Sequence, residues 1–328
     1  MARKQKHRPT VVELFAGAGL LSHAFKLEGF DVVQAVEMDS AAAETYRMNL
    51  GDHICVGDVR EVTPVGRVDV LIAGPPCQGF STLNQNRKTD VRRELCMEVV
   101  RWSEEVRPRF VVVENVATFL ESDASQRMEA GLEAQGFMLF KFILDAHDFG
   151  VAQRRRRSFV IATRGSKPMI KALRVSNRAS TVRDAWRGLS TVPDGKNHHV
   201  APTPSQLAED RMKAMPKGGG KQDVMANRPD LAPKSWWALG RNATDVWSRL
   251  RWDEPANTLR TCLLNPSKGR YIHPKQNRVI SIREAARLHS IPDTWKFTGS
   301  PTSSARQIGN SVPPLLGRAV ARAVRRCG

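Results

Sequence analysis

Short apolar runs alternate with amphipathic segments between residues 11 and 163. The apolar runs are rich in Val, Ile, Leu and Phe, as buried strands are, whereas the amphipathic segments space apolar residues three or four positions apart, as helices do. The expected strands cover residues 11–15, 31–39, 53–59, 68–76, 109–116, 137–146 and 157–163, and the expected helices 20–30, 41–50, 91–106 and 125–136. This alternation predicts a doubly wound α/β sheet.

The pattern changes after about residue 165. Residues 190–270 hold many of the Pro, Gly and Trp residues and show little periodicity, and the sequence KGGGK at 217–221 predicts a flexible loop. Four tryptophans in this region favour a small aromatic core in a loop-rich domain, with rings that face a nucleic acid as the alternative. Helical patterns return within residues 279–292 and at 315–326.

Charge is divided unevenly between the two halves of the chain. The 328 residues carry a formal net charge of +18, but residues 1–150 hold 17 Lys and Arg against 22 Asp and Glu. Residues 151–328 hold 34 against 11, spread along the segment rather than packed into a tail. A basic surface that only confers solubility is one interpretation. We favour a polyanion-binding half joined to a neutral catalytic half.

The sequence argues against secretion and against a membrane span. No apolar run approaches the ~18 residues that a transmembrane helix needs, and the basic N-terminus lacks the features of a signal peptide. The five cysteines are odd in number and widely spaced, and no two form a C-x-x-C pair, so neither a disulfide framework nor a zinc site is expected. We expect a protein of the reducing cytoplasm.

Two acidic positions and a glycine turn predict a site for an adenosine-bearing cofactor. Gly17 and Gly19 follow the first expected strand, but Ser22 stands where a dinucleotide fingerprint has its third glycine. Glu37 ends the second strand, where a carboxylate can accept hydrogen bonds from ribose hydroxyls, and Asp58 ends the third, where it could accept from an adenine amine. These residues do not separate NAD from S-adenosylmethionine, although the missing pyrophosphate loop favours S-adenosylmethionine.

Candidate catalytic residues follow later strands of the same expected sheet. Cys77 lies in GPPCQGFS, just beyond a strand, where open α/β sheets bind ligands. Glu114 ends the buried run VVVENV, and its burial should raise its pKa and make it a plausible proton donor. The run QRRRR at 153–157 precedes the last strand. It either coats a surface or binds an anion.

These segments resemble the motifs of the DNA cytosine-5 methyltransferase family. ELFAGAG is similar to the cofactor motif and GPPCQGFS to the catalytic loop. ENV, the Q-x-R-x-R pattern of residues 153–157, the segment REAARLHSIP and QIGNSVPP follow in the family's order. The resemblance covers about residues 11–320 apart from a variable centre near 191–255. Leu20 and Ala152 stand where the family commonly has glycine and proline, and neither change removes a functional side chain.

The resemblance implies a mechanism and a set of site residues. Cys77 would add to carbon 6 of cytosine, Glu114 would hold or protonate ring nitrogen 3, and Arg155 and Arg157 would contact the base carbonyl and stabilise the thiolate. No metal is needed, because the sulfonium group of the implied methyl donor, S-adenosylmethionine, is already a potent electrophile. The implied product is S-adenosylhomocysteine. The implied cofactor contacts are Phe15, Ala16, Gly17, Ala18, Gly19, Leu20, Glu37, Met38, Asp58, Val59, Pro76, Asn310 and Val312.

The resemblance also implies how DNA is bound. The expected architecture is a Rossmann-like mixed sheet of the class I methyltransferase type, formed by residues 1–190 and 305–328, with a smaller irregular target recognition domain at 191–304. The target cytosine would be rotated out of duplex DNA, and the loop after Cys77 would be mobile and close over it. The helix after residue 314 would fold back onto the N-terminal domain. The implied DNA contacts are Gln78, Ser81, Gln153, Thr258 and Arg260.

Three alternatives to this interpretation remain at the level of sequence. A methyltransferase acting on carbon 5 of cytosine in RNA, such as tRNA, would use the same chemistry, although a recognition region of more than 100 residues favours duplex DNA. A non-catalytic DNA-binding relative should have lost Cys77, Glu114 or the arginines, which this chain keeps. A nicotinamide oxidoreductase should show three glycines and no basic half. We expect a monomer, with a cognate restriction endonuclease, if present, acting separately.

Overall fold

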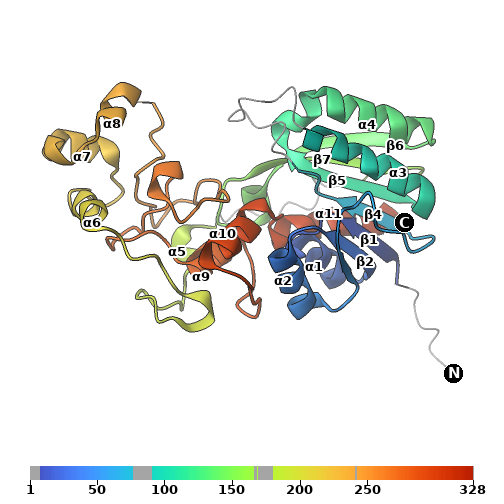
Figure 1. Cartoon of the computed structure of the whole chain (residues 1–328), viewed down its shortest axis with the longest axis horizontal. Coiled ribbons are helices and arrows are strands. Elements are labelled where there is room, and N and C mark those ends of the chain that lie inside the picture. Colours follow the sequence, from blue (N-terminus) through green and yellow to red (C-terminus); the bar gives the residue numbers. More distant parts are fainter. Residues whose placement is uncertain (1–7, 77–90, 166–167, 169–179, 241, 328) are drawn as a thin grey trace. The chain divides into compact units, whose positions relative to one another are not determined.

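The computed structural model describes residues 8–76, 91–165, 168, 180–240 and 242–327. They form two compact units (Figure 1), the first drawn from the ranges 1–149, 156–175 and 312–328 and the second from 150–155 and 176–311. The division expected from the sequence, with boundaries at 190/191 and 304/305, assigns functions to segments and stays a prediction.

The first unit contains a sheet of seven strands and the helices that cover it. Its strands are β1 (Thr10–Leu14), β2 (Asp31–Glu37), β3 (Ile54–Val56), β4 (Val70–Ala73), β5 (Phe110–Val116), β6 (Met138–Asp145) and β7 (Arg156–Thr163). Its helices are α1 (Leu20–Leu27), α2 (Ser40–Leu50), α3 (Met97–Val106), α4 (Asp123–Ala134) and α11 (Pro314–Cys327), with 3-10 helices η1 (Val91–Cys96), η2 (Ala117–Glu121) and η3 (Ala146–Phe149).

The strand order β3-β2-β1-β4-β5-β7-β6 confirms the predicted doubly wound sheet. Strands β1 to β5 run parallel to one another, whereas β7 pairs antiparallel with both β5 and β6, which makes the sheet mixed. The chain moves outward from β1 to β3 and then returns to place β4 on the other side of β1. Ligands of such sheets bind beyond the carboxyl ends of the strands at this reversal. The segments after β1 and β4 therefore meet where a ligand is expected.

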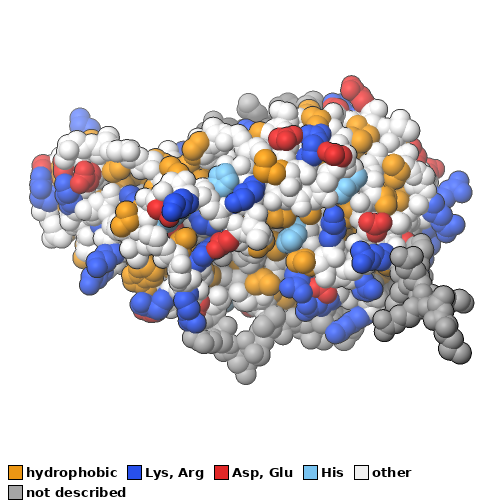
Figure 2. Space-filling view, turned by 90° about the horizontal axis from the view of Figure 1, so that it is seen from below, with side chains coloured by type: hydrophobic (Ala, Val, Ile, Leu, Met, Phe, Trp, Pro, Cys, Tyr) orange, Lys and Arg blue, Asp and Glu red, His pale blue; other side chains and the backbone are white. Residues whose placement is uncertain are grey.

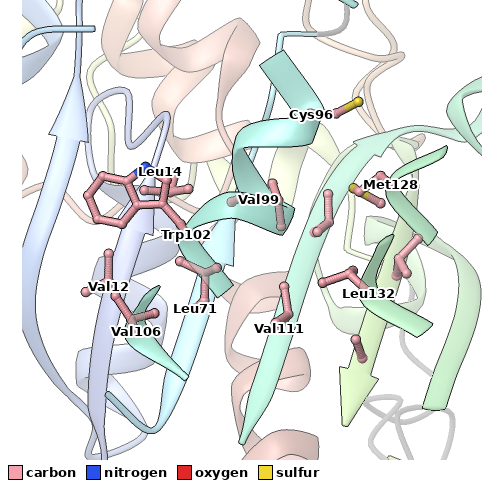
Figure 3. Close-up of a cluster of buried hydrophobic side chains, with 14 of the residues drawn as sticks. Val12, Leu14, Leu71, Cys96, Val99, Trp102, Val106, Val111, Met128 and Leu132 are labelled. Carbon is pink, nitrogen blue, oxygen red and sulfur yellow. The ribbon is translucent and has the colours of Figure 1, made fainter. Parts of the chain in front are cut away.

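Helices α3 and α4 cover one face of the sheet. Side chains alternate between the faces of a strand, so Val12 and Leu14 of β1 point the same way. Figure 3 shows them beside Trp102 of α3, in a buried cluster that Leu132 of α4 also joins. Trp102 is fully buried, and its indole nitrogen donates to the Val59 carbonyl at 3.1 Å. This contact ties α3 to the segment that follows β3.

The opposite face is covered by α1, on which α11 packs. Glu13 alternates with Val12 along β1 and accepts a hydrogen bond from Ser22 of α1, which places α1 on this face. A Cβ added to Gly317 of α11 would lie 2.7 Å from Ala24 Cβ, so glycine permits the close approach of α1 and α11. Glu28, at the end of α1, accepts from two arginines of α11. The predicted return of the last helix to the N-terminal domain is confirmed.

The second unit consists of short helices joined by irregular segments. They are α5 (Val182–Ala185), α6 (Gln206–Lys213), α7 (Lys221–Asn227), α8 (Lys234–Leu239), α9 (Ile282–Leu288) and α10 (Pro301–Asn310), with 3-10 helices η5 (Lys196–His198), η6 (Pro229–Leu231) and η7 (Pro266–Lys268). Trp236 and Trp247 lie in a buried cluster with ring centroids 5.5 Å apart, whereas Trp237 is 51% exposed. The predicted aromatic core is therefore confirmed for two of the tryptophans.

Buried arginines hold the loops of this unit together. The guanidinium group of Arg249 donates to the carbonyls of Met212, His273 and Gln276 and to the side chain of Asn277. Arg278 forms a buried ion pair with Glu284 at 2.7 Å. Part of the basic charge counted in the sequence therefore stabilises the interior.

Two local predictions differ from the structure. The segment 91–106 begins as the 3-10 helix η1 and becomes α-helical only at Met97. The predicted flexible loop at 217–221 ends in an ordered residue: Lys221 is buried, begins α7, and donates its ammonium group to the Asn242 carbonyl at 2.7 Å. The glycines indicated flexibility, but this hydrogen bond and burial fix the last residue.

Charged side chains are mixed on the surface. On the face that Figure 2 draws, Lys and Arg are interspersed with Asp and Glu rather than gathered into one block. Among the helices of the described ranges, none is both long enough and apolar enough to cross a membrane.

Candidate active site

The turn after β1 enters the left-handed region of backbone conformation at three positions, two of which are glycines. Phe15, Gly17 and Gly19 all have positive φ angles, of 57°, 55° and 85°. A Cβ on Gly19 would lie 2.5 Å from Cδ2 of Tyr46, so packing excludes a side chain there. A Cβ on Gly17 would meet nothing within 4 Å. The turn therefore presents its main chain to open space beside Gly17.

Glu37, the last residue of β2, lies against this turn. One carboxylate oxygen accepts the Gly17 N–H and the other the Asp39 N–H, each at 2.7 Å. Burial raises the pKa of Glu37, although these hydrogen bonds oppose the rise. Each carboxylate oxygen has a second lone pair, so both can still accept from a ligand hydroxyl. The adjacent Met38 is 65% exposed and offers an apolar surface next to the carboxylate.

Asp58 and Val59 follow β3, as predicted, but the Asp58 side chain has a protein partner. Arg60 donates to both Asp58 oxygens, at 3.0 and 2.5 Å, and these hydrogen bonds lower the pKa of Asp58 to about 2. Asp58 is therefore a carboxylate at neutral pH. An amine that binds it has to share it with Arg60 or displace the arginine.

The ends of β4 and β5 lie side by side at the edge of the sheet where the catalytic residues are predicted. Ala73 pairs with both Leu14 of β1 and Val113 of β5, so the segments beyond these three strands start side by side. A Cβ on Gly74 would lie 3.8 Å from Glu114 Oε2, and Asn115 donates its amide to the Pro75 carbonyl at 3.1 Å. These contacts fix the chain up to Pro75. Cys77, Gln78, Ser81 and the loop that follows lie outside the described residues.

Glu114 and Arg157 form a pair at this edge of the sheet. Glu114 is 7% exposed, and Arg157 Nε lies 3.2 Å from its Oε1. The antiparallel register brings the start of β7 beside the end of β5 and so places Arg157 within reach. The predicted carboxylate and one predicted arginine therefore lie next to each other. Glu114 directly follows Val113, the partner of Ala73 at the end of β4.

The remaining predicted residues divide between the units. Val312 is buried in the first unit, whereas Asn310 is an exposed residue at the end of α10 in the second. Gln153 and Arg155 also belong to the second unit and are almost completely buried, at 0% and 1% exposure. A direct contact of either side chain with DNA would require the unit to rearrange.

Thr258 and Arg260 are the predicted DNA contacts with accessible surface. Thr258 donates its hydroxyl to the Arg154 carbonyl at 2.8 Å, and Arg260 is exposed. Leu259 between them is fully buried. The segment is thus anchored at Leu259, between a half-buried Thr258 and an exposed Arg260.

Sequence reasoning missed Asn115 and Glu13. Asn115 lies inside the ENV motif and positions the residues before Cys77, so the motif itself contained the signal. Glu13 is a buried acid in an apolar strand, and burial raises its pKa to about 8. An acidic residue within the run VVELF was the available indication.

Comparison with known proteins identifies the family. The model of the family described as C-5 cytosine-specific DNA methylase matches residues 9–326. The chain belongs to this family. It is a DNA (cytosine-5)-methyltransferase, and the family implies S-adenosylmethionine as the methyl donor and DNA as the substrate. This membership decides between the alternatives that the sequence left open, in favour of cytosine methylation in DNA.

Curated relatives of the methylase match it along most of its length. It is 33% identical to the type II methyltransferase M.Eco47II of Escherichia coli, over 96% of this chain and 78% of that protein. It is 32% identical to M1.HphI of Haemophilus parahaemolyticus, over 96% and 86% of the two chains. It is 28% identical to M.AgeI of Thalassovita gelatinovora, over 96% of this chain and 98% of that protein.

Solved structures share the fold. The methylase superimposes with a TM-score of 0.71 on a prophage-encoded E. coli protein solved as a candidate DNA modification methyltransferase, at 24% identity over 97% of this chain and 99% of that one. The score against S. pombe Dnmt2 methyltransferase is 0.65, at 15% identity and the same coverage.

Proposed function

We propose that this methylase modifies one cytosine within a specific duplex DNA sequence, as the modification enzyme of a type II restriction–modification or defence system. The observation that carries the proposal is the Glu114–Arg157 pair at the tips of β5 and β7, next to the strand that leads into Cys77. The names of the relatives, which are type II methyltransferases, support the biological setting.

The residues at the ends of β1 and β2 fit the adenosine part of S-adenosylmethionine. Open space beside Gly17, acceptor capacity on Glu37 and the exposed side chain of Met38 are what a ribose and an adenine ring require. We assign Glu37 to the ribose hydroxyls, Met38 to adenine, and Asp58 to the adenine amine. The other contacts proposed are Phe15, Ala16, Gly17, Ala18, Gly19, Leu20, Val59, Pro76, Asn310 and Val312.

In the proposed chemistry, Cys77 makes cytosine carbon 5 nucleophilic. Its thiolate forms a bond to carbon 6, and the electron pair of the 5,6 double bond moves into the ring toward nitrogen 3. Glu114 holds or protonates that nitrogen, and Arg157 contacts the base carbonyl and stabilises the negative charge. S-adenosylmethionine, when bound, supplies the electrophilic methyl group. Loss of the carbon 5 proton to a base, followed by departure of the thiolate, restores the aromatic ring.

The substrate must reach this site outside the helix. Carbon 5 of a stacked cytosine is inaccessible, and extruding the base costs a few kcal/mol. We assign the recognition of the duplex to the second unit, with Thr258 and Arg260 as contacts on its surface and Gln78 and Ser81 as contacts on the catalytic loop. The enzyme acts as a monomer, because each event modifies one strand and needs no two-fold symmetry.

Replacing Cys77 by Ser tests the covalent mechanism. Methyl transfer to plasmid DNA should fall to background while duplex binding is retained, because serine is a far weaker nucleophile at neutral pH. Bisulfite sequencing of a host plasmid before and after expression would also reveal the modified sequence. In addition, duplexes with 5-fluorocytosine at that position should trap the wild-type enzyme, since fluorine cannot leave as a proton does. Near wild-type turnover of the variant, or active wild-type enzyme without a trapped adduct, would contradict the scheme.

A further inference from the structure

Both main-chain hydrogen-bonding groups of Leu259 are held by side chains of the Q-x-R-x-R motif. The Leu259 N–H donates to Gln153 Oε1 at 2.9 Å, and the Leu259 carbonyl accepts from Arg155 at 3.0 Å. The two segments also pair through their main chains, since Arg154 N–H donates to the Ala256 carbonyl at 2.8 Å. The motif therefore fixes the main chain between the half-buried Thr258 and the exposed Arg260.

The same guanidinium group reaches the end of α10. The second terminal nitrogen of Arg155 donates to the Gly309 carbonyl at 2.7 Å and to the Ser311 carbonyl at 3.0 Å. These two residues flank Asn310, whose side chain is exposed. One buried, planar cation thus holds the main chain on both sides of a proposed cofactor contact and between two proposed DNA contacts.

His289 links Gln153 to Ser311. Because the Leu259 N–H occupies Gln153 Oε1, the Gln153 amide nitrogen is the donor to His289 Nδ1, at 2.9 Å. His289 Nδ1 is then an acceptor, so the neutral imidazole carries its proton on Nε2, which donates to the Ser311 carbonyl at 3.1 Å. Ser311 therefore receives hydrogen bonds from both Arg155 and His289.

The end of α10 and the segment 258–261 are packed in direct contact. A Cβ on Gly309 would lie 2.5 Å from the carbonyl carbon of Arg260, so the end of α10 rests directly on the main chain of the 258–261 segment. A displacement of either segment must move the other or break the hydrogen bonds of a buried guanidinium group, which is costly.

We propose that Arg155 is a positioning residue that couples DNA binding to cofactor binding, rather than a second contact to the cytosine base. The proposal rests on the proposed function, because it takes Thr258 and Arg260 as DNA contacts and Asn310 as a cofactor contact. Arg157, which pairs with Glu114 in the first unit, acts on the base. The two arginines of the motif, two residues apart, therefore have separable roles.

Comparing Arg155→Lys with Arg157→Lys in the full-length protein tests this division. Lysine keeps the charge but cannot donate in the fork geometry that reaches three carbonyls. The dissociation constant of S-adenosylhomocysteine would be measured by calorimetry with and without the duplex that the enzyme methylates. Duplex affinity would be measured by fluorescence anisotropy, and the methylation rate by single turnover at saturation.

We expect the duplex to tighten S-adenosylhomocysteine binding by ~5-fold or more in wild-type protein and by less than ~2-fold in Arg155→Lys. Duplex affinity of this variant should fall about tenfold, while its single-turnover rate stays within about threefold of wild type. Arg157→Lys should keep the coupling and lose at least ~100-fold in single-turnover rate. If Arg155→Lys does not fold, His289→Gln serves as the second variant. It leaves Arg155 in place and should reduce the coupling at least by half.

Absence of coupling in the wild-type protein would overturn the inference, as would full coupling in the folded variants. An Arg155→Lys variant with normal binding and a rate loss like that of Arg157→Lys would make Arg155 a catalytic residue and also overturn it. Failure of the proposed function would be distinguishable, because wild-type enzyme would then give no carbon 5 methylation and no 5-fluorocytosine adduct.

Discussion

Replacing Glu13 by Gln should stabilise the first unit increasingly as pH rises. Glu13 lies in β1 with 2% of its surface exposed. Burial raises the pKa of Glu13 from 4.5 to about 8; the hydrogen bond from Ser22 opposes this rise, and the negative charge of Glu37 adds to it. Between these two pH values the unfolded chain has lost the proton that the folded chain still holds. Raising the pH through this window therefore lowers the free energy of unfolding, by about 1.4 kcal/mol per pH unit at most.

The magnitude follows from the width of the window. From pH 5 to pH 8 the loss that Glu13 imposes on the wild-type protein amounts to about 3 kcal/mol. Gln cannot ionise, and its amide oxygen can still accept the hydrogen bond from Ser22. The variant should therefore gain about 3 kcal/mol relative to wild type over this range, with little further change above pH 8.

Urea unfolding followed by circular dichroism at pH 5, 6, 7 and 8 would measure the difference between variant and wild type. Glu44→Gln, at an exposed position of α2, provides the matched control, and its difference from wild type should not grow with pH. A Glu13→Gln difference that is constant with pH, or that falls as pH rises, would refute the argument that a buried protonated carboxyl group opposes stability here.

Two further substitutions test contacts described above. Gly309→Ala should destabilise the second unit by about 1–3 kcal/mol, because the added methyl group meets the main chain of Arg260; an unchanged melting temperature would contradict the close approach. Glu28→Ala should cost about 1 kcal/mol at pH 7, since Glu28 accepts from two half-exposed arginines of α11. Burial raises the pKa of Glu28, but the arginine hydrogen bonds outweigh it and lower that pKa, so this contribution should vanish as pH falls through the folded pKa. Unfolding of variant and wild type at a series of falling pH values would check this.

The sheet could be predicted because its signal is local. Short apolar runs rich in β-branched residues, such as residues 110–113, favour a buried strand, and the structure confirms this one within β5. The second unit lacks such periodicity. Its stability depends on long-range contacts such as those of Arg249 with residues 24 to 37 positions away, and no local pattern reveals which arginine will be buried.

The candidate site likewise contains residues that the sequence could predict and others that it could not. The position of Glu114 at the end of a buried run and the resemblance to the family motifs indicated Glu114 and Arg157. The antiparallel pairing of β5 with β7 explains why these residues, 43 positions apart, meet. The same motif gave Arg155 the same role, since the sequence does not show that one arginine belongs to each unit. Their partners separate the two arginines: Arg155 donates to the carbonyls of Leu259, Gly309 and Ser311, whereas Arg157 pairs with Glu114.

The course of the chain has a consequence for how such an enzyme can change its target. Because α11 packs against α1 after the chain has completed the second unit, that unit is inserted between two portions of the catalytic scaffold. On the proposed assignment of DNA recognition to the second unit, an exchange of interior coding sequence would replace the recognition unit, while helices α1 and α11 of the first unit keep their contacts. A new sequence specificity would then arise from exchange of the second unit, with the first unit unchanged.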